Sequence, residues 1–84
     1  MSILEKKEVC GVLCTFYANK SGAMWTGCYN GYVFGDYIEL SIPKDGSAPK
    51  DWNDEEIRER VDMFKTFCEE KLSLFQENER KAKL

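Results

Sequence analysis

The sequence predicts an α+β domain: an antiparallel β-sheet of three or four strands, followed by one long C-terminal α-helix packed on one face. Residues 8–42 alternate with the period of a strand, whereas residues 54–79 repeat with the period of an amphipathic helix. The change of period near Asp51 separates the two kinds of element and gives the order βββα or ββββα. We therefore expect one domain over residues 1–84, with a flexible lead-in (1–7), a sheet (8–42), a linker (43–52) and a helix (53–80).

The strands are delimited by turn residues. Residues 8–18 read as the first strand, and residues 19–22 as a turn that ends in Gly22. A second strand begins at residue 23. Asn30-Gly31 is a strong two-residue hairpin signal, but Gly35-Asp36 competes with it, so the strand boundary stays open between them. In either case the last strand ends near Pro43, with Ile38, Leu40 and Ile42 facing inward.

The start of the helix is well specified. Asn53 is a preferred N-cap, and Glu56 three residues later completes a capping box. Trp52 and Ile57 occupy the positions of a hydrophobic staple. One apolar stripe runs along the helix and should pack on the sheet: Ile57, Val61, Phe64, Cys68, Leu72 and Phe75.

Three further apolar residues, Met63, Phe67 and Leu74, form a second stripe roughly 100° away on the helix. A strongly twisted sheet would bury both stripes. Alternatively, the second stripe stays open as a partner-binding or homodimer surface. The sequence does not decide between a buried and an exposed second stripe.

The aromatic residues gather between residues 16 and 37, and alternation cannot place all of them under one helix. If Met24 and Cys28 face the helix, Trp25 and Tyr29 face away from it, as Tyr17 does. We expect Tyr17, Trp25 and Tyr29 to lie on the uncovered sheet face. There they would form cross-strand aromatic pairs or a binding hot spot for a protein partner.

The charge distribution favours a protein partner over nucleic acid. The net charge of −3 arises in residues 51–84, while residues 1–50 hold five acidic residues and five lysines. No basic face for phosphates is evident, so binding of single strands through stacked aromatics is the weaker alternative. One acidic group near the helix start could mimic nucleic-acid phosphates: Asp51, Asp54, Glu55, Glu59 and Asp62.

Catalysis, cofactors and metal ions are not expected. The chain has no histidine and no Gly-rich phosphate loop, and its four cysteines form no C-x-x-C pair. Neither a signal peptide nor a transmembrane run is evident, so we expect a cytoplasmic protein with buried free thiols.

No family motif is present. In size and acidic composition the chain resembles small stand-alone proteins of phages and mobile elements, many of which bind and block a host complex. The resemblance implies a non-catalytic protein-binding module, an inhibitor or regulator of a larger assembly such as an anti-defence protein. A subunit that only oligomerises is the structural alternative.

Overall fold

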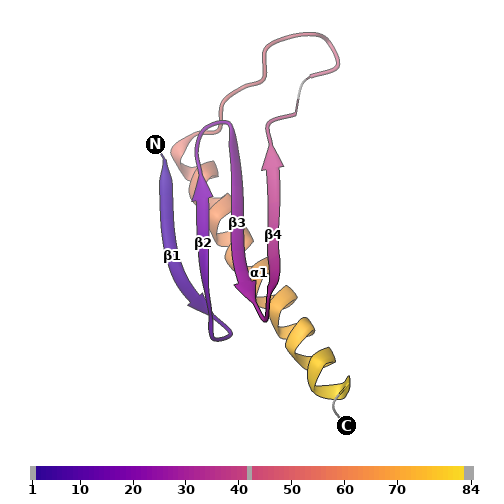
Figure 1. Ribbon diagram of the computed structural model, residues 1–84. Coiled ribbons are helices and arrows are strands. Elements are labelled where there is room, and N and C mark those ends of the chain that lie inside the picture. Colours follow the sequence, from indigo (N-terminus) through magenta and orange to yellow (C-terminus); the bar gives the residue numbers. More distant parts are fainter. Residues whose placement is uncertain (1, 42, 83–84) are drawn as a thin grey trace.

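The protein is a four-stranded antiparallel sheet with one long helix across one of its faces, as seen in a computed structural model that describes residues 2–41 and 43–82 (Figure 1). The elements are β1 (Ile3–Val9), β2 (Val12–Ala18), β3 (Gly22–Tyr29), β4 (Tyr32–Glu39) and α1 (Asp54–Ala82). Each strand pairs with its neighbour in the sequence, so the sheet order is β1-β2-β3-β4. The predicted fold class is confirmed, with four strands.

The predicted lead-in over residues 1–7 is wrong, because β1 occupies most of it. The predicted first strand over 8–18 is also interrupted, since Cys10-Gly11 makes a tight turn between β1 and β2. Both turn residues have positive φ, 52° at Cys10 and 78° at Gly11. Asn30-Gly31 has the same geometry, with φ of 50° and 80°. The turn between β3 and β4 therefore lies at Asn30-Gly31 and not at Gly35-Asp36, and Gly35 lies inside β4.

The core lies between the sheet and the first helix stripe. From α1 it takes Ile57, Val61, Phe64, Cys68 and Leu72, all buried. From the sheet it takes alternate residues of β2 and β3: Val12, Cys14, Phe16, Ala18, Ala23 and Trp25. Ile38 and Leu40 pack at its margin, in agreement with their predicted inward orientation, while Ile42 lies outside the described residues.

Trp25 is the centre of this core, and the prediction that it faces away from the helix is wrong. Its side chain is 0% exposed and stacks on Phe16, its partner in the β2–β3 register, with ring centroids 6.3 Å apart. The indole Nε1 donates a hydrogen bond of 2.7 Å to Asp36 Oδ2. Burying the largest side chain of β3, with its polar atom bonded, outweighs burying Met24 and Cys28, which lie on the opposite face.

The helix begins as predicted. The Asn53 side chain accepts a hydrogen bond of 2.8 Å from the Glu56 amide, and Glu56 Oε1 accepts one of 3.2 Å from the Asn53 amide. Both members of the staple, Trp52 and Ile57, are buried. The helix continues to Ala82, two residues beyond the predicted end.

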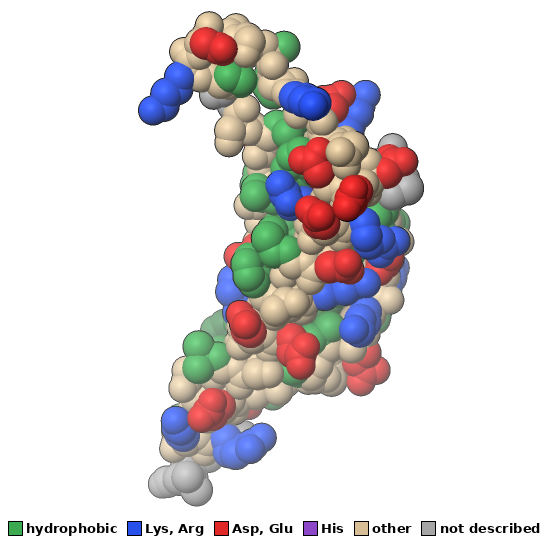
Figure 2. All heavy atoms as spheres, turned by 180° about the vertical axis from the view of Figure 1, so that it is seen from behind, with side chains coloured by type: hydrophobic (Ala, Val, Ile, Leu, Met, Phe, Trp, Pro, Cys, Tyr) green, Lys and Arg blue, Asp and Glu red, His purple; other side chains and the backbone are tan. Residues whose placement is uncertain are grey.

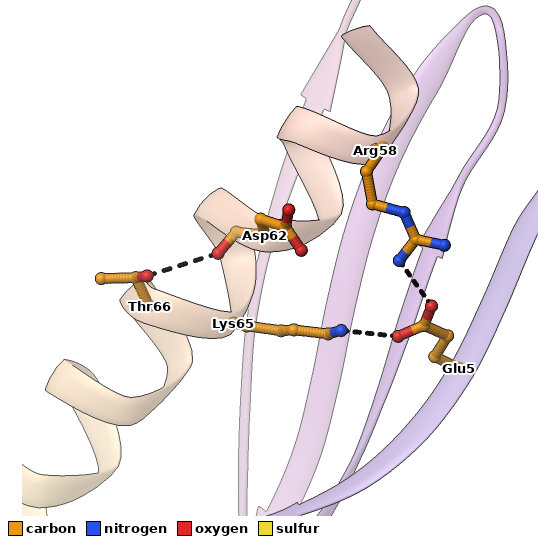
Figure 3. Close-up of polar contacts among 5 residues, drawn as sticks. All are labelled: Glu5, Arg58, Asp62, Lys65 and Thr66. Atoms are coloured by element: carbon orange, nitrogen blue, oxygen red, sulfur yellow. Dashed lines mark hydrogen bonds and ion pairs between the residues drawn. The ribbon is translucent and has the colours of Figure 1, made fainter. Parts of the chain in front are cut away.

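An ion-pair clamp joins α1 to the outer strand β1 (Figure 3). Glu5 of β1 lies 2.6 Å from Lys65 Nζ and 2.7 Å from Arg58 Nη1, one oxygen to each cation. The hydrogen bonds from Lys65 and then Arg58 lower the pKa of the Glu5 carboxyl. The clamp therefore orients the first half of the helix over β1.

Candidate protein-binding face

The face of the sheet opposite α1, called the open face below, is uncovered by any described element and is largely apolar. Its most continuous feature is a row of one side chain from each strand, the apolar row: Leu4, Tyr17, Met24 and Tyr37. These four residues are successive partners in the registers of β1–β2, β2–β3 and β3–β4. Tyr37 is 66% exposed and Met24 is 43% exposed. Large apolar groups aligned across a whole sheet make this row the candidate interaction surface.

Two other rows complete the open face. The middle row is polar or small: Lys6, Thr15, Thr26 and Gly35. Beyond it, toward the two hairpin turns, Leu13, Cys28 and Val33 form a second apolar group. The open face thus presents two apolar bands with a narrow polar band between them.

A hollow of about 540 Å³ lies alongside the apolar row over β2, β3 and β4, where residues from the linker rise beside the sheet. Tyr17, Met24 and Tyr37 line it from the strands, and Pro49 and Asp51 line it from the linker. Linker residue Trp52 donates its amide to the Lys20 carbonyl at 3.0 Å, which holds the end of the linker against the β2–β3 turn. The hollow is therefore a concave, mainly apolar site whose volume lies in the range of ligand-binding pockets, so it has room for a side chain of a partner.

The rim of the hollow is negatively charged. Glu39 and Asp51 both line it, and the Nζ of Lys20 lies 3.8 Å from Asp51. Asn19 donates a hydrogen bond of 3.1 Å to the Tyr17 hydroxyl and fixes the ring at the wall of the hollow. An apolar floor with acidic groups at the rim suits an apolar side chain that has a basic neighbour.

Only one of the three residues predicted for the open face lies there. Tyr17 is part of the apolar row, whereas Trp25 is in the core. Tyr29 faces α1, where its ring packs edge-on against Phe75 at 5.8 Å and its hydroxyl donates to Glu79 at 3.2 Å. Burial and the Glu79 carboxylate raise the pKa of Tyr29. The sequence reasoning missed Leu4, Met24 and Tyr37, whose alignment depends on the register of three strand pairs.

The second stripe of α1 is open along most of its length. Phe67 is 43% exposed and Leu74 is 59% exposed, while Met63 is half-buried against the core. Phe67 and Leu74 border a shallow hollow beside β4, together with Asp36, Glu70 and Lys71. Figure 2 shows hydrophobic side chains along this margin of the helix, at the left of the view. The sheet does not bury the two exposed members of the stripe.

The acidic residues near the helix start are exposed but do not form an uninterrupted patch. All five candidates are exposed: Asp51, Asp54, Glu55, Glu59 and Asp62. Arg58 and Lys65 lie among them, so red and blue side chains are interspersed over the helix in Figure 2. Asp54 and Glu55 also lie in the first turn of α1, where negative charge interacts favourably with the helix dipole.

The cysteines are free thiols, but the expectation that they are buried is wrong for Cys28, which is exposed on the open face, and Cys10 is only half-buried. Cys14 and Cys68 are both buried, and their Sγ atoms lie 3.5 Å apart. Burial and the neighbouring Cys14 thiol raise the pKa of Cys68 to about 12, which disfavours the reactive thiolate. Within residues 2–41 and 43–82, no three Cys, Asp or Glu side chains are arranged to hold a metal ion.

Comparison with protein-family models, curated proteins and solved structures found no match to this chain. The one described helix is too polar to cross a membrane.

Proposed function

We propose that this protein is a non-catalytic protein-binding module that inhibits or regulates a larger assembly, and that it binds its partner through the apolar row and the adjoining hollow. The observation that carries the proposal is the alignment of Leu4, Tyr17, Met24 and Tyr37 across all four strands, leading to a concave site. Tyrosine and methionine at such positions supply large contact area, and tyrosine is enriched among residues that dominate binding energy.

The rim indicates the chemistry of the partner. An apolar side chain seated in the hollow against Tyr17 and Met24 would place its neighbours beside Glu39 and Asp51. A lysine or arginine next to the inserted residue would pair with these carboxylates. The preferred partner segment is therefore apolar with an adjacent basic residue, a complementarity that steers encounter and fixes register.

The test is affinity capture from a lysate, with and without nuclease, followed by calorimetry of the purified partner against matched variants. Tyr37→Ala should weaken binding by at least about tenfold, the effect of removing a hot-spot residue. Leu13→Ala is the control, because Leu13 is equally exposed at 66% on the same face but does not line the hollow. It should leave the affinity within about twofold.

Two results would contradict the proposal. Capture that disappears with nuclease would indicate a nucleic-acid ligand instead. A partner that binds the wild type and Tyr37→Ala equally would place the interface elsewhere on the molecule.

A further inference from the structure

The two edges of the sheet differ sharply in how they are protected against strand pairing. β1 carries four consecutive charged residues, Glu5-Lys6-Lys7-Glu8, and its Glu5 is held by the clamp to α1. β4 is eight residues long, has no Lys or Arg, and exposes Val33 to 79% and Tyr37 to 66%. Natural proteins use charges to prevent edge-to-edge association. β4 carries two acidic residues, but Asp36 is bonded to Lys71 and Trp25 within its own chain and Glu39 lies at the end of the strand, so β4 is the less protected edge.

The outward-facing backbone groups of β4 can be identified from the ladder. Tyr29 and Tyr32 flank the two-residue turn, so they form the first hydrogen-bonded pair of the hairpin. At the other end, the Leu40 amide donates to the Ser21 carbonyl at 3.1 Å. Even-numbered residues of β4 therefore bond to β3. The amides and carbonyls of Val33, Gly35 and Tyr37 point to the free edge.

We propose that this edge pairs with a second copy of the chain, β4 antiparallel to β4, around a two-fold axis at Gly35. Gly35 would then face Gly35 of the second copy, and Val33 would face Tyr37. The two sheets become one continuous eight-stranded sheet with both helices on the same face. The proposal goes beyond the proposed function and does not depend on it.

Charge selects this register over its nearest competitor. Residues that pair across an antiparallel ladder point to the same face of the sheet. An alternative register must therefore keep open-face residues of one β4 opposite open-face residues of the other. A two-fold at Asp36 pairs as many residues but sets two aspartates opposite each other, which is destabilising. The two-fold at Gly35 sets Asp36 opposite Phe34 instead. On the open face it also joins the apolar row of one copy, through Tyr37, to Val33 and Cys28 of the other.

The helix supplies an independent observation for the same axis. Lys71 Nζ lies 3.4 Å from the Gly35 carbonyl oxygen, so the middle of the second stripe lies beside Gly35. The axis consequently passes near residues 70 and 71, midway between Phe67 and Leu74. Two antiparallel helices would set Phe67 against Leu74 and Glu70 against Lys71, twice each. Apolar residues would thus face apolar residues and opposite charges would face each other, as an interface between identical surfaces requires.

Lys71 need not leave its position when the edge pairs. Its ammonium also lies 3.2 Å from Asp36 Oδ1, and that contact holds it on its own protomer. The Gly35 carbonyl oxygen has two lone pairs and can accept from Lys71 and from the amide of the second copy together.

The test is sedimentation equilibrium of the wild type and of two matched proline variants, with circular dichroism to verify folding. Val33→Pro removes an outward amide of β4 and leaves the β3–β4 ladder intact. Lys6→Pro makes the matching change on β1. Val9 and Val12 flank a two-residue turn and form a hydrogen-bonded pair, so the backbone amides of Leu4, Lys6 and Glu8 point to the free edge of β1. We expect Val33→Pro to weaken the dimer at least about tenfold, and Lys6→Pro to leave it within about twofold.

Two measurements keep the test decisive if a proline variant fails to fold. Glu70→Lys changes one exposed helix residue and should weaken the dimer by setting like charges across the axis. In the wild type alone, amide exchange at Val33, Gly35 and Tyr37 should slow as concentration rises. A monomer up to about millimolar concentration would overturn the proposal. So would a dimer that neither Val33→Pro nor Glu70→Lys weakens.

Discussion

At the scale of single residues, the core is closely packed around Gly27, where β2 and β3 pass beneath α1. Gly27 has no side chain there because Cys14 occupies the space. A Cβ at Gly27 would lie 2.8 Å from Cys14 Sγ and 3.6 Å from Trp25 Cζ3. Cys14 in turn cannot move away from β3, since its Sγ is already 3.5 Å from Cys68.

Gly27→Ala should therefore lower the free energy of unfolding by about 1–3 kcal/mol through overpacking. Removing the sulfur should relieve the clash, so Cys14→Ala combined with Gly27→Ala should cost less than the two single changes together. Urea unfolding of all four proteins gives this coupling free energy. Simple additivity would show that the two residues do not compete for the same space.

Trp25 illustrates what the sequence could not provide at this scale. Both faces of β3 carry apolar residues, Met24 and Cys28 on one and Trp25 and Tyr29 on the other, so alternation alone leaves the orientation undetermined. The orientation depends on Phe16 and Asp36, which are 9 and 11 positions away in the sequence. The candidate site was partly missed for this reason, because the apolar row exists only once the strand registers are set.

At the scale of elements, local signals were sufficient wherever the turn or cap chemistry is strong. The Asn53 capping box was predicted and forms, and the turn at Asn30-Gly31 was one of the two alternatives that the sequence offered. The Cys10-Gly11 turn was missed because cysteine rarely adopts positive φ and is not a turn residue. Without that turn, β1 could not be separated from β2.

The Glu5 clamp governs how α1 is attached to β1, and its contribution should depend on pH. Replacing Glu5 with Gln should lower the free energy of unfolding by about 0.5–1 kcal/mol at pH 7, since the pair is partly exposed. The pKa of Glu5 is lowered in the folded state, so this contribution is full above the ordinary value of 4.5 and disappears as pH falls through the folded pKa.

Unfolding of wild type and Glu5→Gln, compared at pH 7 and at successively lower pH, would measure the effect. The difference between them should shrink toward zero in acid. Glu8→Gln serves as the control, because Glu8 is an exposed residue of the same strand on the open face. An equal loss in both variants would mean that general charge, and not the clamp, is responsible.

At the scale of the whole molecule, 84 residues bury a small core, and stability should be increased by association. If the β4 edges pair, the melting temperature must rise with protein concentration, because dilution favours dissociated chains. In the dimeric range a tenfold rise adds about 0.7 kcal/mol per chain. For a domain of this size that corresponds to roughly 3–5 °C. Val33→Pro should show this rise only at concentrations at least about tenfold higher, and Lys6→Pro should behave as the wild type does. A wild-type melting temperature that stays constant over a hundredfold range would show that the fold is stable as a single chain.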